Sequence, residues 1–212
     1  MNYSKKWRLS GMLAIALAAT ITISSPAASG LFDGPVDRLP VEERVALRQG
    51  QVVMTGEEGE YIGRILVKTP IATAWEVLTD YNNFQNFLPN VAKSEVIEKN
   101  GNSLVFEQVN IIRVFIFTQK PRVKIAVTQT YPQQIAFRLI EGDVDSLEGV
   151  WQIEPVSPYP GAPPDRVLIA NQVTVDPGKI STRDLFFSIY KKSTSETLAA
   201  IKKEIEKRTE NN

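Results

Sequence analysis

The sequence predicts an α+β fold in which a curved antiparallel sheet wraps around one long C-terminal helix, with two short helices closing a hydrophobic cavity. Three observations indicate this arrangement. Apolar and polar residues alternate with period two through the middle of the chain, between short turn-like segments. Two short helical segments precede these runs, and a single long amphipathic segment follows them.

The strands are expected on both sides of the short helices. The first strand region, Gln51 to Thr69, is interrupted by the turn-like "GEEGE". The later runs are joined by short segments rich in Gly, Pro, Asn and Asp, which indicates an antiparallel meander. These runs are Val91 to Glu98, Ser103 to Gln119, Arg122 to Tyr131, Gln134 to Ile140, Gly149 to Pro155 and Val167 to Val175.

Two short helices are expected before the meander. Pro70 can stand where a helix begins, and apolar residues follow it at helical spacing as far as Leu78, so we predict a helix that ends near Asp80. A second helical stretch, Asn82 to Leu88, stops before Pro89 because the residue before a proline avoids the helical region.

The C-terminal segment predicts one long amphipathic helix. Ser181 or Thr182 can cap its N-terminus. A helix is about 10 Å wide and cannot fill the concave face of a broad twisted sheet, so we expect space beside it that the two short helices could close. The apolar stripe of the helix is Leu185, Ile189, Leu198, Ile201 and Ile205.

Residues 1–29 have the layout of a secretory signal peptide. A basic start, Lys5 to Arg8, precedes an apolar run from Gly11 to Ile23 and then small residues. The run is shorter than the roughly 20 residues that span a bilayer, which favours a cleaved leader over an uncleaved membrane anchor. We therefore expect export to a periplasm, or to a thylakoid lumen in a photosynthetic source. Residues 30–50 would form a lead-in with a short helix, and residues 51–209 the folded domain.

The absence of Cys and His excludes several classes of function. Without them the chain has no disulfide, no Ser-His-Asp or Cys-His nucleophile pair, and no thiolate or imidazole metal site. It also has no Asp-rich calcium loop and no Gly-rich nucleotide loop. Removal of the leader would leave 21 Lys and Arg against 24 Asp and Glu, which argues against nucleic acid as a partner. No metal or cofactor is expected.

A resemblance to a known superfamily rests on the segments "PIATAWEVLTDYNNFQNFLPNVAKSEVIEKNG", "FEQV", "GDVDSLEGVWQIEP" and "SETLAAIKKEIEKR". Together they resemble the polyketide cyclase/dehydrase and lipid-transport proteins of the START-like (SRPBCC) superfamily, and most closely its coenzyme Q-binding START group. The resemblance implies a helix-grip fold of the START and Bet v 1 type, with a tunnel for an apolar molecule. It does not imply a reaction, because many members only bind or carry lipids, quinones or polyketide-like rings. This chain differs from the quinone-carrier relatives in having an apparent export signal.

The predicted ligand site consists mostly of aromatic residues. Those within "VLTDYNNFQNFLPN", Val77 to Asn90, can either close an ordinary core or line the tunnel mouth, where large rings pack against a ligand at low entropic cost. Strand alternation predicts inward-facing rings as well, with core packing as the alternative, whereas Trp75 is interpreted as core. The predicted set is Tyr81, Phe84, Phe87, Leu88, Phe106, Phe137, Trp151, Phe186 and Tyr190.

Two other functions stay open beside the favoured binding of a hydrophobic small molecule. A cyclase or dehydrase would need a buried acid or base, for which Glu107 and Tyr131 are the candidates, although such residues most often lie on solvated faces. An interaction module would use "NIIRVFIF", which is apolar on both faces and is either covered or free to dock. Docking on a membrane would involve Ile111, Phe115 and Phe117, with Arg113, Lys120, Arg122 and Lys124 near the headgroups.

Overall fold

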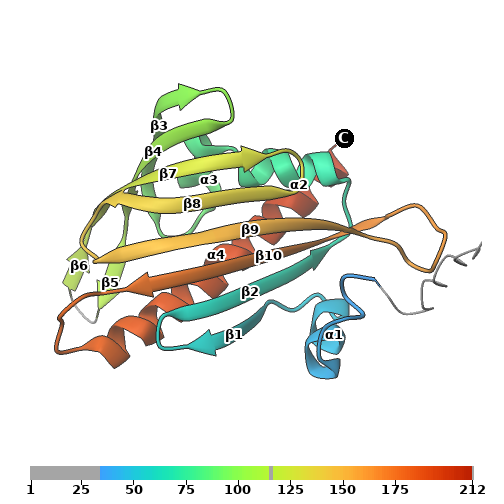
Figure 1. Ribbon diagram of the computed structural model, residues 1–212, viewed down its shortest axis with the longest axis horizontal. Coiled ribbons are helices and arrows are strands. Elements are labelled where there is room, and N and C mark those ends of the chain that lie inside the picture. Colours follow the sequence, from blue (N-terminus) through green and yellow to red (C-terminus); the bar gives the residue numbers. More distant parts are fainter. Residues whose placement is uncertain (1–33, 115–116, 212) are drawn as a thin grey trace, which may run out of the picture.

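An eight-stranded antiparallel sheet curves around the C-terminal helix α4 (Arg183–Glu210) in the computed structural model (Figure 1). The structure describes residues 34–114 and 117–211. This sheet confirms the predicted α+β helix-grip fold. In spatial order its strands are β1 (Val53–Glu57), β2 (Glu60–Val67), β10 (Arg166–Asp176), β9 (Ser146–Val156), β8 (Gln134–Glu141), β7 (Arg122–Thr130), β4 (Ser103–Asn110) and β3 (Val91–Asn100).

The connectivity explains how the sheet closes around the helix. Strands β7 to β10 form the predicted meander, and β2 then pairs with β10, so that the β1–β2 hairpin extends the sheet on the side of α4. The predicted turn "GEEGE" joins β1 to β2. Glu58 and Gly59 at this turn have φ angles of 52° and 99°, in the left-handed region that Gly adopts at little cost.

The predicted strand Ser103 to Gln119 is wrong as a single element. Strand β4 ends at Asn110, and a separate two-stranded sheet follows, formed by β5 (Ile112–Val114) and β6 (Phe117–Gln119). The amide of Ile111 donates to the carbonyl of Asn90 at 2.8 Å, so the chain leaves the ladder between β4 and β7 at this point. No Gly or Pro marks the turn, and the apolar run therefore read as continuous.

The short helices form as predicted, with a small change at their start. Helix α2 (Ile71–Leu78) follows Pro70, and the second stretch is a 3₁₀ turn, η1 (Tyr81–Asn83), that leads into α3 (Phe84–Phe87). Helix α1 (Val41–Arg48) belongs to the lead-in and packs against the outer face of the sheet. Its Leu47 lies in a small cluster with Leu66 and Leu168. None of the helices in the described part of the chain is long and apolar enough to cross a membrane.

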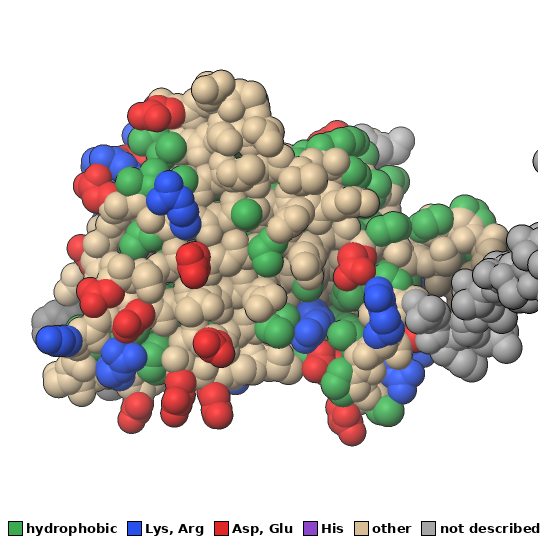
Figure 2. Space-filling model, in the orientation of Figure 1, with side chains coloured by type: hydrophobic (Ala, Val, Ile, Leu, Met, Phe, Trp, Pro, Cys, Tyr) green, Lys and Arg blue, Asp and Glu red, His purple; other side chains and the backbone are tan. Residues whose placement is uncertain are grey.

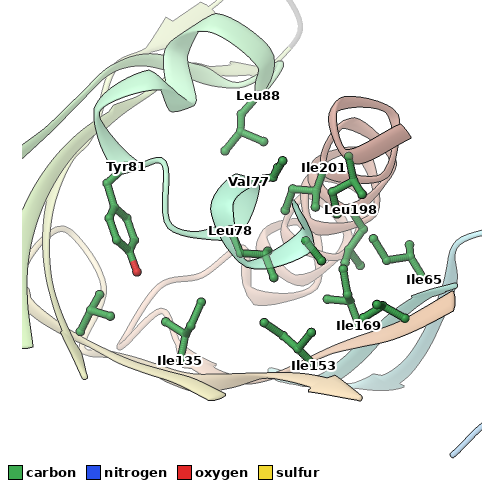
Figure 3. Close-up of a cluster of buried hydrophobic side chains, with 14 of the residues drawn as sticks. Ile65, Val77, Leu78, Tyr81, Leu88, Ile135, Ile153, Ile169, Leu198 and Ile201 are labelled. Carbon is green, nitrogen blue, oxygen red and sulfur yellow. The ribbon is translucent and has the colours of Figure 1, made fainter. Parts of the chain in front are cut away.

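Helix α4 is gripped along only part of its length. Thr182 precedes it, as predicted, but its side chain makes no capping hydrogen bond. Leu198, Ile201 and Ile205 are buried against the sheet and α2 (Figure 3), whereas Leu185 is 45% exposed and Ile189 is only half-buried. The predicted apolar stripe is therefore covered in the C-terminal half of the helix only.

Polar contacts fix the C-terminal end of α4. Arg208 forms an ion pair with Asp80 at 2.7 Å, and the Thr69 and Thr209 hydroxyls are hydrogen-bonded at 2.7 Å. The guanidinium of Arg208 also lies over the Phe87 ring, 5.7 Å from its centroid. This end is thus tied to β2, α2 and α3, while the N-terminal end of α4 stands at the other end of the sheet (Figure 1).

Candidate ligand-binding site

The concave face of the sheet is built from two neighbouring rows of paired residues. Paired residues in adjacent strands point to the same face. One row runs from Asn171 through Trp151 to Ile135, and the next from Val173 through Gly149 to Phe137. Ile135 is 2% exposed and lies in the main core, which identifies this face as the inner one.

A first aromatic cluster lies where η1 and α3 meet the sheet. The ring of Tyr81 is 5.4 Å from that of Phe84 and 4.9 Å from that of Phe106, measured between centroids. Phe84 in turn contacts Phe87, edge to face, at 5.7 Å. Figure 3 shows the Tyr81 ring pointing down from the chain before α3 into the curve of the sheet. The structure thus brings together these four residues of the predicted set.

The Tyr81 hydroxyl is held inside this cluster. It accepts a hydrogen bond of 3.0 Å from the Gln129 side-chain amide. Burial disfavours the charged phenolate and raises the pKa of Tyr81 to about 12, although the bond from Gln129 acts in the opposite direction. Tyr81 is therefore neutral at physiological pH. Leu88, also in the predicted set, is buried next to the cluster.

A second aromatic cluster lies against the N-terminal half of α4. Tyr190 stacks on Tyr61 at 5.9 Å and on Phe186 at 6.0 Å, between centroids. Burial raises the pKa of the Tyr190 hydroxyl well above its ordinary value. Phe137 packs against this cluster and against the main core, so it bridges the two aromatic groups.

The space for the Phe137 ring depends on the glycine at position 149, which has no side chain. A Cβ atom at Gly149 would lie 2.6 Å from the tip of the Phe137 ring and 2.3 Å from the carbonyl oxygen of Gln172. Any larger residue at Gly149 would therefore displace this ring or the backbone of β10.

Incomplete burial is the feature that distinguishes this region from an ordinary core. Phe137, Trp151, Phe186 and Tyr190 all face the inside of the fold, yet each remains half-buried. Fully packed interiors leave few such gaps around large rings. Phe137, Phe186 and Tyr190 pack together beside the half of α4 whose own apolar stripe is not covered. We refer to this part of the inner face, together with the neighbouring Trp151, as the candidate cleft.

Two surface hollows occur on the opposite, outer face of the sheet, which Figure 2 shows in front. The first, of about 780 Å³, lies over outward-facing residues such as Ala126, Ala136 and Val150. The second, of about 730 Å³, lies between the lead-in and the sheet, and Gln172 borders both. They are shallow and lined largely by small or polar side chains, unlike the aromatic inner face. Of the predicted set, Phe137 borders the first hollow, and the other members line neither hollow.

The candidate acid–base residues do not face the interior. Glu107 lies on the outer face and pairs with Arg122 at 3.3 Å. Tyr131 is 66% exposed and meets Trp75 edge to face at 5.2 Å, in the turn between β7 and β8. Trp75, interpreted as core, is partly buried and packs against the main core. The catalytic candidates are thus separated from the cleft by the sheet or lie outside its end.

The candidate docking strand is only partly covered by the described residues. Ile111 is half-buried, Phe115 lies outside the described residues, and only the backbone of Phe117 is described. Lys124 pairs with Glu141, as Arg122 does with Glu107, so these cations are partly neutralised. The membrane contact remains a prediction. Across residues 34–114 and 117–211, no three Asp or Glu side chains gather as a metal site would require.

Sequence reasoning missed Asn171 and Gly63, which sit side by side on the inner face. Asn171 is 4% exposed, and its side-chain nitrogen has no hydrogen-bond partner among the described residues. A polar residue at an inward position of the otherwise apolar alternation "VLIANQVTV" was the signal that could have found it. Gly63 gave no such signal, because its role depends on the approach of α4.

Comparison with solved structures supports this fold. The chain is similar to a STAR-related lipid transfer protein from Xanthomonas axonopodis, with a TM-score of 0.55 and 19% identity over 73% of this chain and 92% of that one. It is also similar to the ZhuI aromatase/cyclase from Streptomyces sp. R1128, with a TM-score of 0.54 and 16% identity over 75% of this chain and 95% of that one. A START superfamily protein from Mycobacterium smegmatis is similar with a TM-score of 0.53 and 20% identity over 76% of this chain and 99% of that one.

Sequence comparison gives the family directly. A search of the curated proteins found no match. Residues 67–202, which run from the end of β2 into α4, match the family described as polyketide cyclase / dehydrase and lipid transport. The coenzyme Q-binding group is not singled out by these comparisons. With its helix-grip sheet and a match over most of its length, the chain belongs to the polyketide cyclase/dehydrase and lipid transport family.

Proposed function

We propose that this protein binds and carries a hydrophobic small molecule, such as a lipid, a quinone or an isoprenoid-like compound, in the cleft between the inner face of the sheet and α4. The observation that carries the proposal is the set of inward-facing yet half-buried rings of Phe137, Trp151, Phe186 and Tyr190. A ligand that covered these rings would leave water at roughly 25 cal/mol per Å². Burial of about 300 Å² would contribute about 7 kcal/mol before ordering costs, which is enough for micromolar binding.

Binding is favoured over catalysis by the chemistry of the inner face. No side chain is charged in the two rows from Asn171 to Ile135 and from Val173 to Phe137. General acid–base catalysis needs an ionisable group within hydrogen-bond reach of the reacting atoms. The phenols of Tyr81 and Tyr190 have raised pKa values and are poor bases near neutral pH. The similarity to an aromatase/cyclase therefore supports the fold and the apolar site, and we carry over no reaction.

Native mass spectrometry of the purified protein, followed by organic extraction, tests the proposal. We expect an apolar molecule to co-purify, or the emptied protein to bind the neutral fluorescent probe N-phenyl-1-naphthylamine. Trp151→Leu removes roughly 50 Å² of ring contact, and at 25 cal/mol per Å² probe binding should weaken about tenfold.

Trp75→Leu is the matched control for this experiment. Trp75 is also half-buried, but it lies on α2 against the exposed Tyr131. This variant should lower stability and leave probe affinity nearly unchanged. A protein that neither retains an extractable molecule nor binds the probe does not carry apolar ligands, and equal losses in the two variants would place the site elsewhere.

The N-terminal residues add a second part to the proposal, which is export. Residues 1–29 lie outside the described residues, and the sequence pattern of a basic start and a short apolar run supports a cleaved leader. The destination would be a periplasm, or a thylakoid lumen in a photosynthetic source. Intact-mass measurement of protein from cell fractions should give a chain that begins just after Ala27, Ala28 or Ser29. A full-length chain in the membrane fraction would favour an uncleaved anchor.

A further inference from the structure

We infer that Asn171 is a polar anchor in the wall of the cleft, and that the ligand is a neutral, largely apolar molecule with a hydrogen-bond acceptor, such as a carbonyl oxygen. This inference deepens the proposed function and rests on it. Asn171 is on β10, where it pairs with Gly63 of β2 beneath α4, and the residue is 4% exposed.

The free energy of the empty protein is raised at this position. The Asn171 side-chain nitrogen is buried and has no hydrogen-bond partner among the described residues. An unsatisfied buried donor of this kind costs about 1–3 kcal/mol. Two other polar groups near the inner face are satisfied, since the Gln129 amide donates to Tyr81 and the Thr69 hydroxyl is hydrogen-bonded to Thr209. An apolar residue would fill the position of Asn171 without this cost.

Two further described side chains have a buried polar atom without a partner, but neither has the same setting. Ser94 lies on β3, at the far edge of the sheet, and Asp165 lies in the segment between β9 and β10. Asn171 is the member of this group that lies on an inner strand beside the half-buried Trp151. Its donor is therefore the one best placed to meet a molecule in the cleft.

The position of α4 explains why a ligand can approach Asn171 from one side only. The Gly63 position, next to Asn171 on β2, is covered by the helix, because a Cβ atom there would lie 2.3 Å from Leu198 Cδ1. On the other side, Trp151 is half-buried. The Asn171 nitrogen is itself buried, so a ligand meets it only when the neighbouring Trp151 ring shifts aside.

The surroundings of Asn171 define the class of ligand. Its carboxamide nitrogen donates, so the group that satisfies it must accept. The rows of paired residues around it contain no cation that could neutralise a carboxylate. Burial of an unpaired charge is costly, which favours a ketone, quinone or ester over a fatty-acid anion. A pure hydrocarbon would leave the donor unsatisfied.

Equilibrium dialysis of the purified full-length chain with three probes of similar shape tests this inference. The probes are 2-acetonaphthone, which has a carbonyl, 2-ethylnaphthalene, which lacks an acceptor, and 2-naphthoate, which is an anion. We expect the ketone to bind about 3- to 10-fold more tightly than the hydrocarbon, because a neutral hydrogen bond contributes about 0.5–1.5 kcal/mol. The anion should bind more weakly than the ketone.

The variant Asn171→Leu keeps the branched shape at Cγ and removes the donor. It should abolish the preference for the ketone, retain affinity for 2-ethylnaphthalene, and leave the melting temperature of the empty protein equal or higher. Asn171→Ala provides the same test of the preference if Leu does not fit. Thr69→Val is the matched control, since it removes a satisfied buried hydroxyl far from the cleft, and it should lower the melting temperature but keep the preference.

Each other outcome decides between the two proposals. The anchor is overturned if the unmodified protein binds the ketone and the hydrocarbon with equal affinity. It is also overturned if both Asn171 variants have a lower melting temperature but keep the preference for the ketone. Either result means that internal water satisfies the Asn171 donor. Binding of 2-naphthoate as tight as that of the ketone overturns the neutral ligand class. Binding of none of the probes counts against the proposed function itself as well as the anchor.

Discussion

Gly63 is a position where α4 approaches the sheet closely, and its replacement by Ala tests how the helix is held. The added Cβ atom would lie 2.3 Å from Leu198 Cδ1 and 2.7 Å from the sulfur of Met54. Met54 is half-buried on the edge strand β1 and can move, because its side chain is flexible. Leu198 is 0% exposed, so it can move only by displacing its buried neighbours. The clash must therefore shift the helix or force Leu198 into a strained rotamer.

Overpacking of this kind costs about 1–3 kcal/mol, against a gain of about 0.4–1 kcal/mol from the reduced freedom of Ala in the unfolded chain. We expect Gly63→Ala to lower the free energy of unfolding by about 1–2 kcal/mol, measured by urea denaturation monitored by circular dichroism. Leu198→Ala alone should cost about 2–5 kcal/mol. In that shortened background, Gly63→Ala should become neutral or stabilising, because the clashing methyl is gone. Additive effects in this double-mutant cycle would refute the reasoning.

Two further predictions concern the C-terminal end of α4 and the first aromatic cluster. The pKa of Tyr81 is raised to about 12, so the burial of its neutral form contributes fully to stability below pH 10. Up to about 3 kcal/mol of the free energy of unfolding should be lost as pH rises from 10 to 12. Tyr81→Phe, compared by denaturation across this range, should lose less. A Tyr81→Phe profile as steep as that of the unmodified protein would contradict the assignment. Arg208→Met breaks the ion pair with Asp80 and the contact with Phe87, and should cost about 1–2 kcal/mol, less at high salt. Lys207→Met is the control, because the Lys207 side chain is 67% exposed, and it should change the free energy of unfolding by less than about 0.5 kcal/mol. Equal effects of the two substitutions would show that Asp80 and Phe87 do not stabilise this end of α4.

Most of the fold could be predicted from local patterns, because each element carries its own signal. Pro70 and Pro89 bound the two short helices, and alternation with polar turns bounds the strands. The long apolar run after Ser103 was the exception. It contains the end of β4 and all of β5 and β6 without a Gly or Pro at the turns. Hydrophobic pattern alone does not locate a turn whose residues are themselves apolar.

The residues of the candidate site could be predicted from the sequence, but the extent of their burial could not. Aromatic residues at inward positions, such as Phe137 and Trp151, follow from strand alternation. Their half-burial does not, because it depends on where α4 stops covering the sheet. The apolar stripe from Leu185 to Ile205 reads as one continuous surface, yet only its C-terminal part is buried. The register of a helix across a sheet is set by contacts such as Gly63 with Leu198, which no local pattern encodes.

The half-gripped helix has a thermodynamic consequence that connects fold and function. Without a ligand, large rings of the candidate cleft stay partly in water and the Asn171 donor has no partner among the described residues. The unliganded protein therefore lacks stability that a complete core would give. A ligand that binds only the folded state restores it by RT ln(1 + [L]/Kd), which is about 2.7 kcal/mol at a hundredfold excess over Kd. The same incomplete burial allows the ligand to leave again, because the fold is already stable with these rings partly exposed to water. The proposed carrier function needs both properties, and α4, fixed at Arg208 and partly exposed at Leu185, combines them in one element.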